Sequence, residues 1–548
     1  MKKFIIILLV VVAFGLTGCE KWLDINHNPN TATSATPDLI LPGVLTNWCS
    51  DVNGLSATFG AWMGYWAHAG GWSGWTSEKK YEITSSYLSN TGYFNAYYYG
   101  VLTDDKFIRD NSGTNVMYPA ITNVVDAWYY ARLVDMYGDV PYTEANKPNL
   151  TLTPKYDLGS DIYASLITRL DAAMAVFDAK VNAPDAATNA IYAFTTTSDI
   201  IYAGNFTSWK KFANTLKLRL VMRMSNVKSV AALKALMDNT VAYGFITADV
   251  TGSPGYLASS GKTNPLWNSY GKSYDNVKTD PNTEYILNAY MHMKLQGLTD
   301  PRLTNFFFPG ASAGGVLKSF VLGTDGDLVA QPNATVEGNY SWILICANAA
   351  LGSNGTAATV TGALDKQVLF PLSEAQFLQA EAQMRGVIVG ATTSGATVAA
   401  SYTAAVTTAL TVARVTTVNQ TAYLAQANVA WDNAATDAAK LEKLIDQKWI
   451  ANYFLNHFES WNDYRRTGFP RPKGGAVNPL YEMLSYYPGG TIRRQIPRLF
   501  PYPNEEFTLN KTNAMDAIGR QTGVAFTTSE YPFDARTFWD NAPKVIVY

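Results

Sequence analysis

The sequence predicts a mostly α-helical protein that carries a large, irregular, loop-rich insertion. Apolar residues recur at spacings of three and four in separate segments before about residue 247 and after about residue 364. Between these limits Gly, Ser, Asn and Pro dominate, aromatic residues are interleaved, and the helical pattern is mostly lost. A loop-rich stretch of this length inside a globular chain is usually functional or contains strands that periodicity does not reveal.

The first half of the chain contains most of the expected helices. In residues 120–137, Val124, Trp128 and Leu133 belong to one apolar pattern, and Gly138 is placed to end the helix. A second apolar stripe predicts a helix over 157–180. The remaining helices expected before the second half are 206–225, 230–243 and, inside the loop-rich stretch, 282–296.

Helices resume after the loop-rich stretch. Ser373 and the acidic and amide residues that follow it resemble a capping box, which would open a helix that ends at Gly386. Two more helices are expected at 401–414 and 437–457. Small residues at the helix crossings suggest stacked helix pairs of the tetratricopeptide type, although no clean 34-residue repeat appears.

The N-terminus predicts export and a lipid anchor. Two lysines precede a thirteen-residue uncharged run at 4–16, which is too short to span a bilayer but suits a signal peptide. The string LTGC at 16–19 resembles a bacterial lipobox, whose chemistry requires a thiol. We therefore expect residues 1–18 to be removed and Cys19 to carry the lipid that tethers the mature chain outside the cytoplasm.

The mature chain is expected to form one domain with recognisable parts. These parts are a helical scaffold over about 38–246 and 365–470, the loop-rich insertion over about 247–364, and an irregular C-terminal segment over about 471–548.

Composition limits the classes of ligand. The formal net charge is −2 and only 16% of residues are charged, so no basic field is present that would recruit nucleic acid. The chain contains 14 Trp and 33 Tyr. Flat rings beside amide and hydroxyl groups suit neutral ligands such as sugars, although the core of a large helical protein also accounts for most of these rings.

The chain shows no pattern for a disulfide framework, a metal site or a cofactor. With Cys19 lipidated, Cys49 and Cys346 remain, and we expect two free thiols, with a bridge between them as the alternative. The four histidines are scattered and form no HExxH motif. The acidic turn at 325–327 lacks the further ligands that Ca²⁺ needs, so a solvated loop is the expected structure.

Several local strings together carry a family resemblance. They are WLDINHNPN at 22–30, AWYYARLVDMYGDVPY at 127–142, WKKFANTLKLRL at 209–220, QKWIA at 447–451, ESWNDYRRTGFP at 459–470 and RLFPYP at 498–503. In this order they resemble the SusD/RagB family of nutrient-binding outer-membrane lipoproteins of Bacteroidetes. We expect their charged residues to act first in the framework, with Arg132 and Asp135, and likewise Asp463 and Arg465, pairing and capping helix ends.

The resemblance implies both a fold and a function. The family fold is helical, with four tetratricopeptide-like pairs as a scaffold and an irregular ligand-binding half. The implied function is capture of an oligosaccharide or a peptide at the cell surface by a lipid-anchored protein. Such a protein acts as a hinged lid on a SusC-like TonB-dependent transporter in the outer membrane, and no catalysis or cofactor is implied.

Aromatic residues on loops are the candidates for ligand contact. A Gly-rich run exposes one pair of indoles, and the loop-rich stretch supplies further rings beside Asn and Ser. The alternative is that each ring packs between insertion and scaffold. The candidate ligand-binding residues are Trp72, Trp75, Trp267, Tyr270, Tyr274 and Trp342.

Two other functions stay open from the sequence. A surface glycan-degrading enzyme would need two carboxylates about 5–9 Å apart, and the 44 acidic residues neither show nor exclude such a pair. A purely protein-binding helical-repeat scaffold of the envelope would have no affinity for glycans or peptides.

Overall fold

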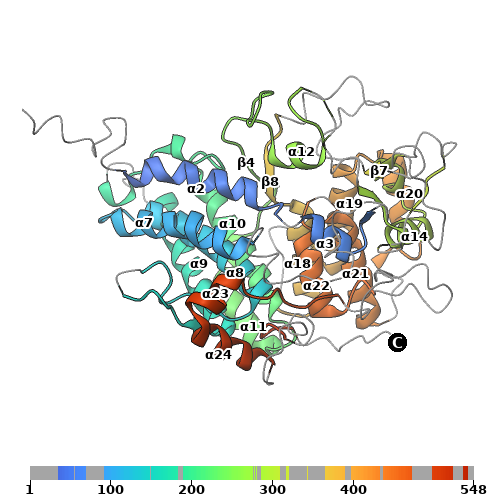
Figure 1. Ribbon diagram of the computed structural model, residues 1–548. Coiled ribbons are helices and arrows are strands. Elements are labelled where there is room, and N and C mark those ends of the chain that lie inside the picture. Colours follow the sequence, from blue (N-terminus) through green and yellow to red (C-terminus); the bar gives the residue numbers. More distant parts are fainter. Residues whose placement is uncertain are drawn as a thin grey trace, which may run out of the picture.

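The computed structural model of the chain (Figure 1) describes residues 35–54, 56–68, 92–147, 150–182, 189–275, 277, 279, 285–308, 316–319, 322, 342–343, 364–388, 397–431, 436–453, 455–471, 496–522 and 535–540. Most of these residues are helical, which confirms the fold class that the sequence predicts. Within them, no helix combines the length and the apolarity needed to cross a bilayer.

Helices occupy both halves of the chain. Those before the insertion are α2 (Pro37–Asp51), α3 (Ser56–Trp62), α6 (Tyr93–Tyr97), which continues into a π-helical turn (Tyr98–Leu102), α7 (Thr103–Asn111), α8 (Met117–Tyr137), α9 (Gly159–Asn182), α10 (Phe206–Arg223) and α11 (Val230–Met237). Those that follow are α12 (Pro265–Tyr270), α14 (Ala289–Gly297), α15 (Leu303–Phe306), α18 (Leu372–Met384), α19 (Val398–Val412), α20 (Thr417–Leu424), α21 (Asp437–Ala451), α22 (His457–Thr467), α23 (Asn504–Leu509) and α24 (Lys511–Thr522).

Short strands form three small antiparallel sheets. The strands are β1 (Trp66–His68), β2 (Val140–Pro141), β3 (Tyr156–Asp157), β4 (Val250–Gly252), β5 (Tyr285–Leu287), β6 (Phe307–Phe308), β7 (Trp342–Ile343) and β8 (Gln367–Phe370). One sheet has four strands in the order β1-β5-β7-β6, and the others pair β2 with β3 and β4 with β8. Because Trp66 pairs with Leu287, an early segment is joined to the insertion.

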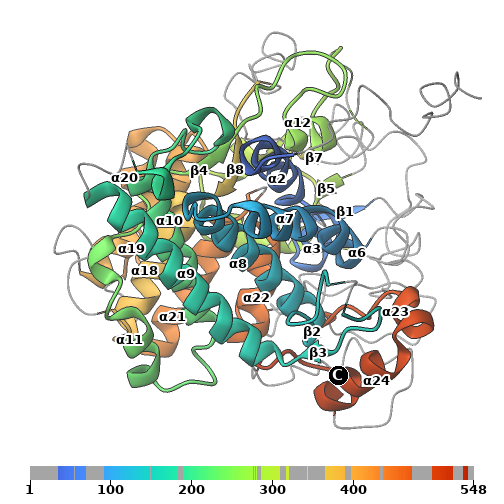
Figure 2. The same cartoon turned by 90° about the vertical axis from the view of Figure 1, so that its left-hand side faces the viewer.

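The scaffold is built from helices that pack against their neighbours in sequence. Helices α8, α9 and α10 lie side by side, and α18 packs on both α19 and α21 (Figure 2). In Figure 1 the first group lies at the left and the second at the right, and the contact between α10 and α18 joins them. This arrangement of helix pairs agrees with the stacking that the sequence predicts.

Helix α8 is central to the left-hand group. It runs for 21 residues and nearly all of them are buried. The Asn115 side chain accepts a hydrogen bond from the Met117 N–H at 2.9 Å at its start. At its end Gly138 adopts φ +79°, a conformation that favours glycine. The expected stop at Gly138 is therefore confirmed.

Two expected helices are interrupted in the structure. The segment 282–296 contains strand β5 before α14, because Asn288 is extended and its side chain caps α14 by accepting from the Tyr290 N–H. The segment 437–457 is divided into α21 and the start of α22. There the Asn456 side chain accepts from the Glu459 N–H and begins a new helix.

The capping box expected at Ser373 is wrong. Helix α18 begins at Leu372 after Pro371, so that Ser373 already lies inside the first turn, and the N-cap residue Pro371 has no side-chain hydrogen bond to offer. The Leu372 N–H instead donates to Asp249 Oδ1 at 2.7 Å. Glu374 is buried and pairs with Arg219 of α10. A contact from a distant segment has replaced the expected local cap.

The C-terminal segment contains more regular structure than expected. Helices α23 and α24 lie within residues 471–548, and α24 packs against β3 below α8 and α9 (Figure 1). Arg520 of α24 donates to the Tyr156 carbonyl of β3 at 3.0 Å. Helix α24 of the C-terminal segment is thus attached to strand β3 of the scaffold.

Candidate functional site

Three of the sequence-predicted functional residues lie outside the described residues. These are Cys19, Trp72 and Trp75. Trp342 lies in β7, where its backbone pairs with Ile286 of β5 and Phe308 of β6. Trp342 therefore lies in the four-stranded sheet, between strands β5 and β6 of the insertion.

Trp267 and Tyr270 lie on the short helix α12 at the top of Figure 1. Asn264 caps this helix, because its side chain accepts a hydrogen bond from the Trp267 N–H at 3.0 Å. The exposed fractions of Trp267 and Tyr270 are 2% and 8%. The indole N–H of Trp267 is buried and has no hydrogen-bond partner among the described residues.

Tyr270 belongs to a buried aromatic stack that connects the insertion to the scaffold. Its ring lies 5.5 Å from Trp66, which stacks on Tyr285 at 4.6 Å. His457 of α22 contacts both Trp66 at 4.6 Å and Tyr65 at 4.5 Å. Burial lowers the pKa of His457 to about 4 in spite of its hydrogen bond to Ser56, so the imidazole is neutral in the core.

Tyr274 differs from Trp267 and Tyr270 because it is about half exposed to solvent. It follows α12 in a turn in which the Ser273 N–H donates to the Val277 carbonyl at 2.8 Å. A ring held in this way can lie against a ligand, whereas Trp267 and Tyr270 are buried in the helix that precedes the turn. The contact of these rings with a ligand stays a prediction.

A cavity of about 300 Å³ lies beside α12. It is bordered by the turn after α2, by β8, by the C-terminal end of α19 and by the connection between α21 and α22. Its lining residues are Asn53, Asp249, Asn264, Leu266, Lys366, Gln367, Val368, Thr411, Val412, Arg414 and Leu455. None of them is a candidate from the sequence, because they come from distant segments and form no local motif.

A second cavity, of about 460 Å³, lies between the end of α9 and the start of α10. It is more open and borders the scaffold alone. Its lining includes Tyr192, Phe194 and Phe206. Because Phe194 and Phe206 are in edge contact at 5.2 Å, these rings are already engaged in packing.

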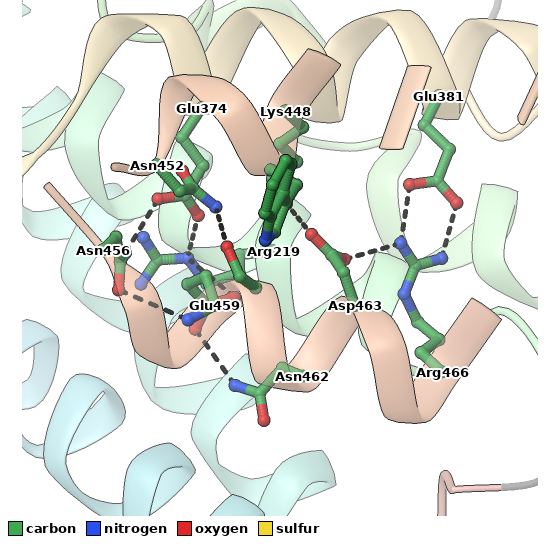
Figure 3. Close-up of polar contacts among 12 residues, drawn as sticks. Arg219, Glu374, Glu381, Lys448, Asn452, Asn456, Glu459, Asn462, Asp463 and Arg466 are labelled. Atoms are coloured by element: carbon green, nitrogen blue, oxygen red, sulfur yellow. Dashed lines mark hydrogen bonds and ion pairs between the residues drawn. The ribbon is translucent and has the colours of Figure 1, made fainter. Parts of the chain in front are cut away.

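A buried network of charges lies between α10, α18, α21 and α22 (Figure 3). Arg219 of α10 donates from Nε to Glu374 Oε1 of α18 at 2.8 Å. Lys448 of α21 lies 2.8 Å from Asp463 Oδ2 of α22. All four side chains are buried. The first pair joins α10 to α18, and the second joins the consecutive helices α21 and α22.

The other pairs of this network are equally enclosed. Arg466 donates from Nη2 to Glu381 Oε2 at 2.7 Å and to Asp463 Oδ1 at 2.9 Å. Arg223 donates from Nη2 to Glu459 Oε2 at 2.5 Å. Burial would raise the pKa of Glu381, but Arg466 and Arg385 outweigh it and lower the pKa to about 2. Glu381 is therefore ionised, and the carboxylates of the network are paired and closed to solvent, which suits a frame rather than acid–base chemistry.

The charged residues of the motif strings have other partners than the sequence predicts. Asp135 accepts from Trp539 Nε1 at 2.8 Å, whereas Arg132 lies over the Trp128 and Phe458 rings at 4.5 and 4.2 Å. The expected pairing of Arg132 with Asp135 is therefore wrong, since both reach to other elements. Arg465 similarly donates to the Arg498 carbonyl and stacks on Trp461, while Asp463 pairs with Lys448 and Arg466.

No bridge is formed by Cys49. It is a free, buried thiol, and burial raises its pKa to about 12. Cys346 lies outside the described residues, as does the acidic turn at 325–327. Within the described ranges no cluster of His, Cys, Asp and Glu is arranged to hold a metal ion.

Comparison with known proteins defines the class. The family model described as "Starch-binding associating with outer membrane" matches residues 29–485. The chain is thus a nutrient-binding protein associated with the outer membrane. It belongs to the SusD-like family. A comparison with curated proteins found no match.

Solved structures share the fold over almost their whole length. A SusD homologue from Bacteroides uniformis is 24% identical with a TM-score of 0.66, covering 92% of this chain and 99% of that one. A chitin-binding SusD homologue from Flavobacterium johnsoniae is 22% identical with a TM-score of 0.68, covering 92% and 99%. A SusD homologue from Bacteroides ovatus is 23% identical with a TM-score of 0.68, covering 92% and 98%.

Proposed function

We propose that the protein captures an oligosaccharide, or alternatively a peptide, at the cell surface and delivers it to a SusC-like TonB-dependent transporter. The observation that carries the proposal is the family match over residues 29–485. The similar protein from Flavobacterium johnsoniae is a chitin-binding SusD homologue, which favours a glycan over a peptide for this chain. The protein would act by binding alone.

The proposed ligand surface combines aromatic residues of the insertion with those of the Gly-rich run near residue 70. Tyr274 offers an exposed ring, and Trp72, Trp75 and Trp342 are the further candidates from the sequence. Trp267 and Tyr270 would contribute by holding the turn that carries Tyr274, since both are buried. Each ring that stacks on a sugar would add about 1 kcal/mol, or roughly a fivefold gain in affinity.

The proposed anchor is the lipid on Cys19. Residues 20–34 would then link the lipid to α2, which begins at Pro37. A tether at this end leaves the helical body free to move over a transporter as a lid.

Calorimetry of a soluble form, residues 20–548, tests capture. Starch-derived and chitin-derived oligosaccharides and a set of peptides serve as ligands. We expect one class to bind, and Tyr274→Ala, Trp72→Ala and Trp75→Ala to weaken it. Tyr99→Ala is the matched control, because Tyr99 is 73% exposed but lies on the scaffold.

The same samples separate the rival functions. New reducing ends after incubation with glycans would support an enzyme and refute binding alone. Absence of binding to every glycan and peptide would favour a purely protein-binding scaffold. Co-purification of the full-length protein with the SusC-like transporter from outer membranes tests the lid.

A further inference from the structure

Helix α7 carries a carboxyl group that the fold buries completely. Asp105 is 0% exposed, and neither of its oxygens has a hydrogen-bond partner among the described residues. An ionised carboxylate is among the most costly groups to bury, because it loses its hydration shell and needs a partner in exchange. The fold must therefore supply either a counter-charge or a proton for Asp105.

The cations near Asp105 are bound to another acid. Asp126 of α8 is also 0% exposed, and its Oδ2 lies 2.6 Å from Arg109 Nη1 and 2.5 Å from Arg169 Nη1. Arg109 follows Asp105 by one turn of α7 and so lies on the same face, whereas Arg169 comes from α9. Both guanidinium groups thus reach the same oxygen of Asp126, which accounts for an ionised Asp126.

The other oxygen of Asp126 is left for Asp105. Asp126 Oδ1 is buried and has no hydrogen-bond partner within the described part of the chain. The two carboxyl groups are close enough for a hydrogen bond once one of them is protonated. One proton between them would give a partner to both acids. Burial, and after it the charge of Asp126, raises the pKa of Asp105 well above its usual value, although Arg109 opposes this.

The surrounding helices add no positive charge that could replace the proton. The Tyr129 hydroxyl of α8 donates to Asp51 Oδ2 of α2 at 2.8 Å. The other ionisable side chains around the two acids are Asp104 of α7, Tyr98 of the π-helical turn, Tyr130 of α8 and Tyr142 after β2. Burial raises the pKa of all these tyrosines, so they are neutral. None of these side chains can neutralise a second carboxylate.

We propose that Asp105 is held as a neutral acid that donates a hydrogen bond to the ionised Asp126, and that this proton joins α7 to α8. The joint has a place in the architecture, because α7 also packs on α2 and α8 also packs on α9. It connects the first described helix of the chain to the scaffold. Since the joint requires a proton, alkali weakens the folded body at one site. The proposal does not depend on what the protein binds.

The direction of the pH dependence follows from proton uptake on folding. In the unfolded chain Asp105 is ionised above its usual pKa of 3.8, whereas the folded chain keeps the proton. Folding therefore takes up one proton, and the folding equilibrium constant falls by up to about tenfold for each unit by which the pH rises. The fall ends where the pH passes the raised pKa of Asp105.

Urea unfolding of the soluble form, residues 20–548, tests the joint between about pH 5 and pH 9 with Asp105→Asn. The amide can donate to Asp126 without a proton that titrates, so the variant should fold as the wild type does at about pH 5. As the pH rises, its folding constant should gain on that of the wild type by up to about tenfold per pH unit. Asp110→Asn is the matched control, because Asp110 is an exposed carboxylate on the same helix and pairs with Lys106.

Infrared spectroscopy provides a second measurement that does not involve unfolding. A protonated carboxyl group has a carbonyl stretching band that is separate from the bands of ionised carboxylates. At pH 7 the difference spectrum between the wild type and Asp105→Asn should contain one such band. The difference spectrum between the wild type and Asp110→Asn should contain none.

Three results would overturn the proposal. They are a pH profile of Asp105→Asn that runs parallel to that of the wild type, a difference spectrum without a protonated-carboxyl band, and failure of Asp105→Asn to fold at pH 5 while Asp110→Asn folds. The third result counts against the joint because an amide at position 105 can make the same hydrogen bond.

Discussion

At the scale of single residues, the core of this protein depends on charged side chains that only tertiary structure can pair. Glu374 follows the serine of the expected helix cap, but it is buried against Arg219. Arg132 and Asp135 are three positions apart on one helix, yet each contacts other elements. Local spacing identifies such residues as framework, but their partners come from segments hundreds of positions away, which a single sequence does not reveal.

The ion pair between Glu381 and Arg466 gives the first prediction. Glu381→Gln is expected to lower the free energy of unfolding by about 3 kcal/mol at pH 7, because it leaves Arg466 buried with one carboxylate fewer. Since the pKa of Glu381 falls from 4.5 to about 2 on folding, its contribution is complete above pH 4.5 and disappears as the pH falls through 2. The deficit of the variant should shrink over that range in urea unfolding.

A surface pair is the control for this variant. Glu442 also accepts two hydrogen bonds from an arginine, but Arg471 is 61% exposed. Glu442→Gln should therefore lower the free energy of unfolding by less than about 1 kcal/mol. An equal loss in the two variants would contradict the importance of burial.

His457 gives a prediction with a different pH range. Its pKa is lowered from 6.5 to about 4 by burial, so protonation favours the unfolded chain as the pH falls below 6.5. The stability advantage of the wild type over His457→Gln should decrease by about 3 kcal/mol between pH 7.5 and pH 4. Urea unfolding at several pH values measures it, and a difference that does not change with pH would contradict a neutral buried imidazole.

At the scale of elements, the sequence predicts helices well where one face is apolar and the other polar. Helix α9 is found near its expected bounds for this reason, whereas α8 and α10 are found near theirs although most of their residues are buried. Helix α22 is different, because its Glu459, Asp463 and arginines are buried along with its aromatic residues. It has no polar outer face, so its apolar spacing does not mark it as a separate helix, and the expected helix 437–457 includes its first residue. Its buried charged residues are needed because they pair with charged residues of the surrounding helices.

Two glycines give opposite predictions for the same substitution. Gly468 ends α22 at φ +78° and ψ +5°, and a Cβ there would meet no atom within 4 Å. Gly468→Ala should therefore destabilise the protein by about 1 kcal/mol through the backbone alone. Gly43 lies inside α2 with equally open space, and Gly43→Ala should stabilise the protein by about 0.5–1 kcal/mol.

Thermal unfolding measures both substitutions side by side. Opposite shifts of the melting temperature are expected. Shifts of the same sign would mean that packing, and not backbone conformation, decides the effect at one of the two positions.

At the scale of the whole molecule, the sequence predicts the helical body and the place of the insertion, but not the cavity. The helical body follows from composition and periodicity, and the aromatic candidates follow from residue type. The cavity beside α12 requires β8, the end of α19 and the turn after α2 to meet. Asn53, Gln367 and Arg414 belong to no local motif in the sequence. Only the fold brings them together around one cavity.

The last prediction concerns how the whole body is held at the membrane. Cys19→Ala removes the thiol that the lipobox chemistry requires, so the protein should appear in the soluble fraction instead of the outer-membrane fraction and should no longer incorporate labelled palmitate. No described helix offers a second way to span the bilayer. Two or more acyl chains hold a protein stably, so the loss of attachment should be nearly complete.

Protease treatment of intact cells then tests the direction in which the wild-type body faces. A lid that receives nutrients from outside must be cut under conditions that also cut a known surface protein. Survival of the wild-type protein would contradict the lid, because a body on the inner side of the outer membrane could not deliver cargo from the medium to the transporter. Cys19→Ala, if retained in the periplasm, should survive and serves as the internal reference.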